Sequence, residues 1–486
     1  MKKKLWFVIT GTLILCSLSA AQPVFTGGEI FPPEEFAARR ARIMALIGDG
    51  VAILQGTTER PGEQALRQNN QFFYLSGVVD PLSILVIDGR SKKSTLLLEP
   101  RNERREFRNG IFRLYPGTEA EKVTGIESIL SRAEFARVME EIGAEGRPIH
   151  TPFRPEVLGE ASAGDPLRLW KMIKADPWDG RVSREEAFIA KLKEAAPRSE
   201  VKDLDPLIDE MRVIKSPREI ELIREATWIS GLAIMEVMRD ARPGQYEYEL
   251  QAAADYIFKK YGAYGPSYFA LIATGSNTYY THYHKNTAVL REDDLVQIDY
   301  APDYKYYQSD ITRVFPANGT FSPWQREYYT ISLKLYQALL TSIKAHEAPR
   351  DIIKVAVGKM DKVLASFRFT DPKIEEAAVA YVERFRTSKR NSLGHMVGMA
   401  VHDVRGKPRE ILEPGMVFTI EPALRLEDEH LGVRLEDILL VTENGIENLS
   451  QFVPIEIDDI EKLMAQPGVS EAILKLPAEA ARSLRR

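Results

Sequence analysis

The chain has almost no cysteine. Only one occurs among 486 residues, Cys16, and it lies in an apolar stretch near the N-terminus. A lipoprotein signal would place a small residue directly before that cysteine, whereas this chain has Leu15. We therefore assign Cys16 no function. The lack of any other thiol excludes a disulfide framework and a cysteine nucleophile from the rest of the chain.

Long hydrophobic runs are also missing beyond the N-terminus. The first residues form three blocks typical of a signal peptide: basic residues 2–4, apolar residues 5–18 and small residues 19–21. We place the cleavage after Ala21 and expect an exported, periplasmic or extracellular protein. The apolar block is too short for a comfortable membrane span, so we expect no membrane association beyond export.

Basic tracts are absent after the first few residues. Lysine and arginine number 65 against 70 acidic residues, which gives a formal net charge of −5. This balance argues against nucleic acid as a partner. Hydrophobic residues make up 44% and charged residues 28%, as in ordinary globular proteins. A chain of 486 residues exceeds one ordinary core, so two domains are expected.

The first domain is predicted to be an α/β unit spanning residues 22–205. Four short apolar runs are expected to be strands: 51–54, 72–75, 84–87 and 95–98. Residues 88–91 would form a hairpin turn between the last two. Residues 145–182 are rich in proline, glycine and tryptophan and show no period, so we expect an irregular segment. Ser183 and Glu186 form a capping pattern for a helix that continues to about residue 194.

The second domain is predicted over residues 206–465, followed by a tail at 466–486. Ser216, Pro217 and Glu219 are typical of a helix start, with serine as cap and proline in the first turn. Ser322 and Pro323 repeat this pattern and open a helix expected to reach about residue 345. Further helices are expected at 248–260 and 351–367.

Two aspartates in this domain are expected to meet on a hairpin. Asp299 follows an alternating segment, and Asp310 lies in a second strand-like segment eleven residues later. Pro302 and its neighbour Asp303 favour a turn between them. A hairpin would place both carboxylates on one face, and the Thr312 hydroxyl could orient one of them. Taken alone, this pair is better explained as two carboxylates on a solvated sheet face, because paired aspartates on exposed hairpins are common.

Two glutamates lie in unusually apolar surroundings. Glu421 ends an apolar strand directly before a proline, and Glu436 is flanked by Leu435 and Ile438. A carboxylate in such a run is costly unless it is paired or coordinated. A salt bridge to Arg434, on the same face, would explain Glu436 but not Glu421.

Three histidines, His282, His395 and His402, occur in apolar or glycine-rich contexts. One of them completes a set of five potential metal ligands: Asp299, Asp310, His395, Glu421 and Glu436. Carboxylate oxygens with one imidazole suit Mn²⁺, Co²⁺, Fe²⁺ or Zn²⁺ better than a structural zinc site. The set predicts a hydrolase with a pair of divalent cations.

Several short segments carry a family resemblance: 297–299, 309–313, 394–395, 401–403, 419–422 and 434–437. They resemble the "pita-bread" metallopeptidases, which include aminopeptidase P, prolidase and methionine aminopeptidase. Residues 67–77 resemble the aminopeptidase P N-terminal domain. The resemblance implies an α+β protein. Its C-terminal pita-bread domain would be a curved, mostly antiparallel sheet backed by helices, and its N-terminal α/β domain would be of the aminopeptidase P and creatinase type.

The resemblance also implies roles for the five ligands. Asp299 would bind one metal, Asp310 and Glu436 would bridge both, and His395 and Glu421 would complete the second. Mn²⁺ is the leading expectation, with Co²⁺, Zn²⁺ or Fe²⁺ as alternatives. A water or hydroxide between the metals would be the nucleophile, because two cations lower its pKa.

Four side chains are implied to act on substrate. Glu421 would carry a proton from that water to the leaving nitrogen. His282 and His402 would hold the substrate carbonyl and the developing oxyanion. Arg434 would either position a substrate carboxylate or orient Glu436, and the sequence does not choose between these roles.

The implied activity is that of an exported Xaa-Pro aminopeptidase acting on peptides with proline at the second position. An Xaa-Pro dipeptidase (prolidase) and a non-catalytic peptide-binding protein are the alternatives, and a metal-free hydrolase of the creatinase type ranks below them. A homo-oligomer is a further expectation. The family usually has a His-Gly pair four and three residues before the ligand histidine, whereas this chain has Asn391 and Ser392. Asparagine cannot titrate near neutral pH, so we expect a lower rate or a different substrate.

Overall fold

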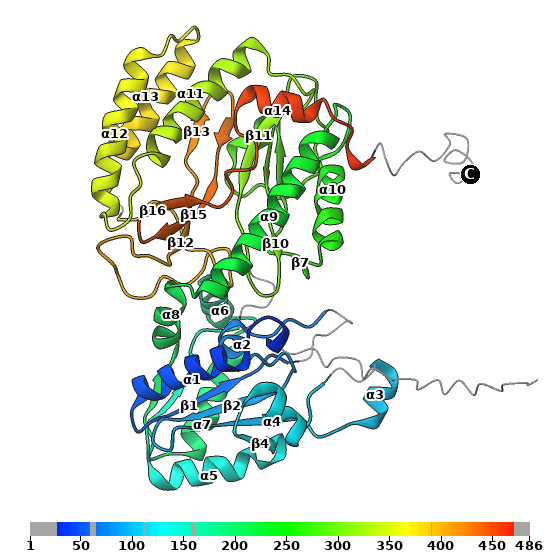
Figure 1. Cartoon of the computed structure of the whole chain (residues 1–486), viewed down its shortest axis with the longest axis vertical. Helices are drawn as coiled ribbons and strands as arrows, with labels where there is room; N and C mark the ends of the chain where they lie inside the picture. Colours follow the sequence, from blue (N-terminus) through cyan, green and yellow to red (C-terminus); the bar gives the residue numbers. More distant parts are fainter. Residues whose placement is uncertain (1–26, 59–64, 110–112, 157–161, 390, 471–486) are drawn as a thin grey trace, which may run out of the picture.

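The computed structural model describes residues 27–58, 65–109, 113–156, 162–389 and 391–470. They form two bodies stacked along the long axis of the molecule (Figure 1). The predicted signal peptide lies outside the described residues. Within the described ranges, no helix is both long and apolar enough to cross a membrane.

The N-terminal body is built on a six-stranded sheet with strand order β4-β3-β2-β1-β5-β6. In chain order the strands are β1 (Val51–Gln55), β2 (Ile84–Asp88), β3 (Lys93–Leu98), β4 (Ser128–Ser131), β5 (Ile149–Thr151) and β6 (Val201–Asp203). Strands β1, β2 and β3 pair antiparallel, and the outer pairs are parallel. The predicted strands at 51–54, 84–87 and 95–98 are confirmed, as is the hairpin turn that joins β2 to β3.

The described helices of this body are α1 (Pro33–Ile47), α2 (Asn70–Ser76), α3 (Glu103–Asn109), α4 (Thr118–Thr124), α5 (Phe135–Glu145), α6 (Asp165–Ala175), α7 (Arg184–Ala195) and α8 (Asp205–Val213). The start of α7 is confirmed, because Ser183 accepts a hydrogen bond from the backbone of Glu186. The segment 145–182 is more regular than predicted, since it contains β5 and α6. Helix α6 lies near the junction of the two bodies (Figure 1).

The predicted strand at 72–75 is wrong, because these residues belong to helix α2. The Asn69 side chain accepts hydrogen bonds from the backbone nitrogens of Gln71 and Phe72, which starts the helix. Every residue of α2 is buried. A helix enclosed on all sides is hydrophobic all round, so its apolar run matches that of a buried strand.

Six α-helices lie among the described residues of the C-terminal body: α9 (Pro217–Asp240), α10 (Glu247–Lys260), α11 (Pro323–Leu340), α12 (Pro349–Ser366), α13 (Pro372–Thr387) and α14 (Ile457–Met464). Ser216 and Ser322 both cap their helices as predicted. Helix α11 ends at Leu340, five residues before the expected end. The helices predicted at 248–260 and 351–367 correspond to α10 and α12.

Short antiparallel strands lie between these helices (Figure 1). Two three-stranded sheets, in the orders β11-β9-β8 and β12-β15-β16, are accompanied by the pairs β13–β14 and β7–β10. Their bounds are β7 (Gly265–Pro266), β8 (Leu271–Thr274), β9 (Leu295–Asp299), β10 (Pro302–Asp303), β11 (Thr312–Pro316), β12 (Val417–Ile420), β13 (Ala423–Leu426), β14 (Leu431–Arg434), β15 (Asp437–Thr442) and β16 (Gly445–Asn448). The antiparallel pairing confirms the expected α+β class.

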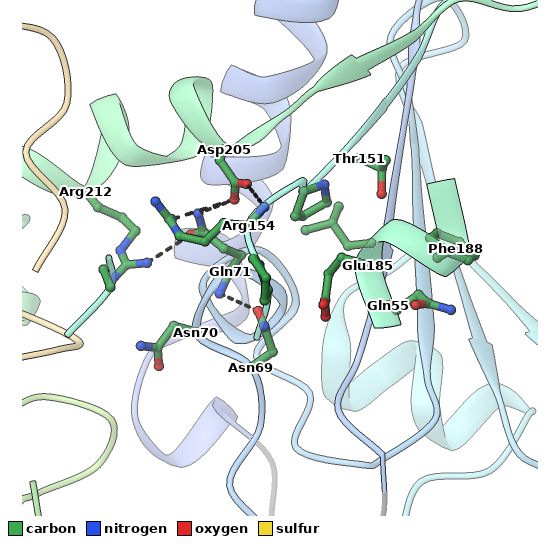
Figure 2. A pocket seen from close by; sticks show the side chains of 14 residues that line it. Gln55, Asn69, Asn70, Gln71, Thr151, Arg154, Glu185, Phe188, Asp205 and Arg212 are labelled. Atoms are coloured by element: carbon green, nitrogen blue, oxygen red, sulfur yellow. Dashed lines mark hydrogen bonds and ion pairs between the residues drawn. The ribbon is translucent and has the colours of Figure 1, made fainter. Parts of the chain in front are cut away.

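The two bodies share an apolar cluster. Phe72 and Phe73 of α2 pack in it with Tyr306, Tyr307 and Met399 of the C-terminal body. A pocket lined by polar and apolar side chains of the N-terminal body lies beside α2 (Figure 2). Its lining includes Asn69, Gln71, Arg154, Asp205 and Arg212. The apolar cluster therefore joins the two bodies.

Candidate metal centre

Asp299 and Asp310 lie side by side, as the hairpin prediction required. Asp299 is the last residue of β9, which pairs with β11 so that Asp299 faces Thr312. Asp310 precedes β11 by two positions. Both carboxylates are buried. The hydroxyl of Tyr268 lies 2.6 Å from Oδ1 of Asp299 and 2.8 Å from Oδ1 of Asp310.

Glu436 is fixed against the same hairpin. The Thr312 hydroxyl donates a hydrogen bond of 2.6 Å to Oε2 of Glu436, and the Glu436 nitrogen donates to the Thr312 carbonyl. Glu421 follows β12, whose last residue, Ile420, pairs with Asp437 of β15. The two glutamates therefore lie at neighbouring strand ends. Thr312 orients a carboxylate as predicted, and that carboxylate is Glu436.

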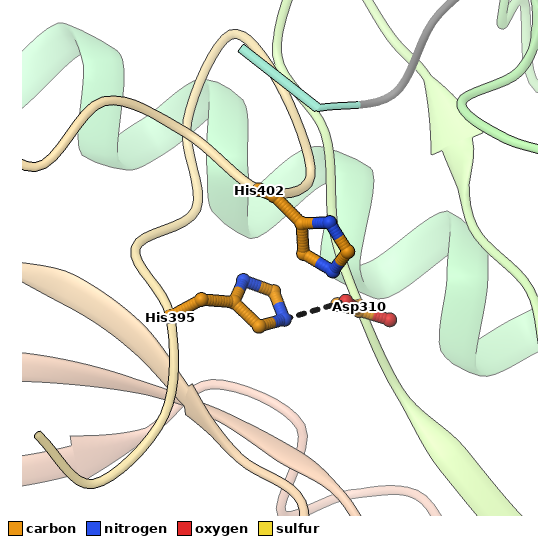
Figure 3. A group of neighbouring side chains, drawn as sticks. All are labelled: Asp310, His395 and His402. Carbon is orange, nitrogen blue, oxygen red and sulfur yellow. Dashed lines mark ion pairs between the residues drawn. The ribbon is translucent and has the colours of Figure 1, made fainter. Parts of the chain in front are cut away.

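Three histidines complete the cluster. Nε2 of His395 lies 3.3 Å from Oδ2 of Asp310 and 3.3 Å from Oε1 of Glu421. The His402 ring lies 4.2 Å from that of His395, centroid to centroid, and both imidazoles point toward Asp310 (Figure 3). The His282 ring lies 6.3 Å from that of His402.

Ligand atoms within 4.8 Å of one another form three groups among the described residues: Asp299 with Asp310 and Glu436, His395 with Glu421 and Glu436, and Asp310 with His395 and His402. The first two groups share Glu436 and together contain all five predicted ligands. The third group also places His402 within reach of a metal ion. The structure thus brings every predicted metal ligand to one place.

The acidic groups repel one another at this buried position. Burial raises the pKa of Asp299 to about 8, although the nearby Arg434 opposes the rise. Burial, reinforced by the neighbouring carboxylates, holds the pKa of Glu436 well above its usual range. Burial also opposes ionisation of Asp310 and Glu421, yet His395 keeps the pKa of each below its ordinary value. A cation would relieve this repulsion.

One buried atom of the cluster, Oε1 of Glu436, makes no hydrogen bond with any described residue, and Nε2 of His395 is held only by its ion pairs with Asp310 and Glu421. A buried polar atom without a partner is costly and rare. Carboxylate oxygens with one imidazole nitrogen also form a donor set that suits divalent transition metals. The residues therefore fit a divalent metal site.

The Arg434 side chain is buried and makes its contacts within the site. Its Nη2 pairs with Asp299, its Nε donates to the Thr312 hydroxyl at 3.2 Å, and its Nη1 donates to the Thr281 carbonyl at 2.8 Å. The side chain is 3% exposed. The salt bridge considered with Glu436 is thus formed with Asp299 instead. Because Thr281 precedes His282, Arg434 also holds the chain that carries this histidine.

Sequence reasoning missed Tyr268. This residue stands 31 positions before Asp299 in a short irregular segment, where no periodic pattern indicates a site. Burial and the charge of Asp299 raise the pKa of Tyr268 well above 10, so its hydroxyl keeps its proton. Asn391, by contrast, is exposed and belongs to none of the three groups.

Comparison with known proteins agrees with this arrangement. Residues 221–443 match metallopeptidase family M24, and residues 36–150 match the aminopeptidase P N-terminal domain. Xaa-Pro aminopeptidases from Haemophilus influenzae and Escherichia coli are each 31% identical over 455 residues, which cover 89% of this chain and 97% of the relative. An Xaa-Pro dipeptidase from Pyrococcus horikoshii is 32% identical but covers only 54% of this chain.

Solved structures show the same fold over both bodies. Escherichia coli aminopeptidase P in complex with substrate gives a TM-score of 0.70 at 27% identity, covering 90% of this chain and 98% of that one. Proline aminopeptidase P II from Yersinia pestis gives 0.70 at 30% identity, covering 90% and 100%. The chain therefore belongs to metallopeptidase family M24, joined to an aminopeptidase P N-terminal domain, and is a hydrolase.

Proposed function

We propose that this protein is a metal-dependent Xaa-Pro aminopeptidase, which removes the first residue of peptides with proline at the second position. Relatives matched over almost their whole length carry that name. The observation that carries the proposal is the position of Glu436, which belongs to both an all-carboxylate group and a group with His395. This is the arrangement that a bridging carboxylate requires.

We assign two divalent cations to these groups, with Mn²⁺ as the first choice and Co²⁺, Zn²⁺ or Fe²⁺ as alternatives. Asp299 would serve one ion, His395 and Glu421 the other, and Asp310 and Glu436 would contact both. The short distance between His395 and Asp310 supports a shared role for Asp310. Two such cations would lower the pKa of a water molecule between them, giving a hydroxide, and would polarise the substrate carbonyl.

Glu421 is placed to move the proton. Its side chain is the most exposed of the four carboxylates, at 31%, so it borders the space open to substrate. The charge of His395 keeps its pKa low, which leaves Glu421 ionised and able to accept a proton. It would then deliver this proton to the proline nitrogen as the peptide bond breaks.

His282 and His402 are placed to stabilise charge on the carbonyl oxygen. Burial lowers the pKa of both imidazoles, so each is neutral near pH 7. A neutral imidazole retains one N–H donor. Two such donors beside the cluster would bind the substrate carbonyl and the oxyanion that develops from it. Arg434 would act indirectly, because its contacts fix Asp299 and the chain before His282.

The site of action proposed is outside the cytoplasm. The basic, apolar and small blocks of residues 1–21 support export. Comparing the N-terminus of the secreted protein with that of the full chain would test it. A mature protein beginning at Gln22 is expected, and a cell-associated protein that still begins at Met1 would contradict export.

The activity is tested by two substrates and one variant. After dialysis and addition of Mn²⁺, the protein should cleave an Xaa-Pro-Pro tripeptide faster than an Xaa-Pro dipeptide, and Asp310→Ala should cleave neither. Preference for the dipeptide would favour an Xaa-Pro dipeptidase. Failure to cleave either, with Mn²⁺ bound, would favour a peptide-binding protein without catalysis.

A further inference from the structure

One segment of the N-terminal body touches both chains that carry the site residues. This bracing segment, residues 67–71, precedes and begins α2. It contacts the aspartate loop, residues 300–309, which connects Asp299 to Asp310. It also contacts the histidine loop, residues 396–403, which follows His395 and includes His402.

Arg67 binds mainly the aspartate loop, although its Nη2 also donates a hydrogen bond of 3.4 Å to the Met399 carbonyl of the histidine loop. Its Nε forms an ion pair with Oδ2 of Asp303, whose side chain is 8% exposed. Its guanidinium carbon lies 4.7 Å from the centre of the Tyr306 ring, within the range of a cation–π contact. Asp303 follows Asp299 by four residues, so this contact acts close to a metal ligand.

The aspartate loop adopts a conformation that needs such support. Lys305 and Tyr306 have φ angles of 51° and 73°, in the left-handed region that residues other than glycine seldom adopt. Tyr306 is held there by the N-terminal body. Its ring stacks on Phe73 at 3.8 Å, and its hydroxyl accepts a hydrogen bond of 3.1 Å from the nitrogen of Gln68.

Asn70 contacts the histidine loop directly, and Gln71 contacts it through Arg212. Nδ2 of Asn70 donates a hydrogen bond of 2.9 Å to the Met399 carbonyl. Oε1 of Gln71 accepts one of 2.9 Å from Arg212, and both residues line the pocket drawn in Figure 2. Arg212 in turn binds Oδ1 of Asp403 at 2.5 Å.

The end of this chain of contacts is almost completely enclosed. The side chains of Arg212, Lys215 and Asp403 are exposed by 3%, 1% and 1%. Asp403 directly follows His402. The carbonyl of His402 also accepts a hydrogen bond of 3.0 Å from the nitrogen of Ala163, again from the N-terminal body. A buried carboxylate bound by two cations moves little, so its neighbour His402 has a fixed backbone.

We propose that Arg67 and Gln71 are positioning residues of the active site. Arg67 fixes the aspartate loop and thereby the separation of Asp299 and Asp310. Gln71 fixes Arg212 and Asp403 and thereby the direction of His402. The kinetic part of this inference rests on the proposed function, whereas the structural part does not. The N-terminal body on this view takes part in building the site.

The two residues should give separable defects. Arg67→Met is expected to weaken Mn²⁺ binding on the order of tenfold, as loss of support around a metal site does. Arg67→Lys should recover part of it, because lysine keeps the charge for Asp303 but not the planar contact with Tyr306. Gln71→Met should leave Mn²⁺ affinity within about twofold and lower kcat by about tenfold, with KM changed less.

Calorimetric titration with Mn²⁺ and hydrogen exchange measure these effects without turnover. Exchange should quicken at residues 300–309 in Arg67→Met and at 396–403 in Gln71→Met. Arg147→Met is the matched control, since it removes a partly buried pair with Asp88 in the same body and should leave Mn²⁺ affinity and both loops unchanged. If Arg67→Met does not fold, Arg67→Lys carries the test.

The inference is overturned if folded Arg67 and Gln71 variants bind Mn²⁺ and exchange in both loops as the parent does. It is also overturned if Arg147→Met produces the same defects, since the effect would then be general loss of stability. A parent protein that cleaves no Xaa-Pro peptide would defeat the proposed function alone. The titration and exchange results would still decide the role of Arg67.

Discussion

The hydroxyl of Thr312 donates a hydrogen bond of 2.6 Å to Oε2 of Glu436, across 124 positions of the chain. The other oxygen of that carboxylate, Oε1, has no hydrogen-bond partner among the described residues. One oxygen is thus fixed by the protein and the other is free to bind a cation. Outer contacts of this kind set the direction in which a metal ligand points.

Replacing Thr312 by valine should weaken metal binding. Thr312→Val keeps the side-chain shape but removes the hydroxyl that orients Glu436, and such losses lower metal affinity or activity by roughly 10- to 100-fold. Calorimetric titration with Mn²⁺ would measure the change. Thr312→Ser, which retains the hydroxyl, is the control and should bind Mn²⁺ nearly as the parent does. Equal affinity for valine and serine variants would show that the hydrogen bond is unimportant.

Asp310→Ala should lose metal and activity together, because Asp310 lies beside both Asp299 and His395. Metal content after dialysis and turnover of an Xaa-Pro-Pro peptide would be compared with the parent. Asp361→Ala is a suitable control, since Asp361 pairs with Arg386 on the surface. Full turnover in Asp310→Ala would exclude a bridging role for this carboxylate.

His402→Ala should retain metal but react slowly. Removing one hydrogen-bond donor to a developing oxyanion lowers the chemical rate by roughly 10²- to 10³-fold. Single-turnover kinetics isolates that step from binding and product release. An unchanged single-turnover rate would remove His402 from this role. Loss of metal would instead make it a ligand, as its place in the group with Asp310 and His395 allows.

Asp80 should make the protein less stable as the pH rises. It is 5% exposed, and burial raises its pKa to about 7, although Arg113 acts in the opposite direction. The folded state therefore binds more protons than the unfolded state between about pH 4 and 7, so the free energy of unfolding falls across this window. Asp80→Asn has no such titration. In urea unfolding, the free energy of unfolding of the variant relative to that of the parent should rise by roughly 2–3 kcal/mol from pH 5 to pH 8.

Parallel pH curves for the parent and Asp80→Asn would contradict that assignment. The measurement is best made on metal-free protein, so that the pH dependence of metal binding does not contribute. Asp361→Asn, at an exposed position, is the control substitution.

The metal cluster could be predicted because it contains charged residues that stand in apolar stretches of the sequence. Glu421 and Glu436 are carboxylates in apolar runs, and such residues need a partner. The alternating pattern around Asp299 predicted the pairing of β9 with β11. The turn expected at Pro302 and Asp303 was wrong, because these residues form strand β10 and the chain turns at Lys305 and Tyr306. Local periodicity and the cost of burial were sufficient for these positions.

Tertiary contacts that leave no local pattern could not be predicted. Tyr268 reaches Asp299 from an irregular segment, and its sequence neighbours give no sign of that contact. Arg434 shares a strand face with Glu436, yet it pairs with Asp299 on another strand. Residues 72–75 read as a strand because enclosure on all sides removes the polar face that would reveal a helix.

Because Tyr306 stacks on Phe73, the fit between the two bodies depends on residues from both of them. A chimera that recombined near residue 215 would inherit Phe73 from one parent and Tyr306 from the other. If the parents differ at this contact, the chimera would contain every metal-binding residue but would hold these residues on a displaced backbone. Residues 303–307 and 67–73 should therefore be exchanged as a unit in any such hybrid, and should diverge in step among relatives.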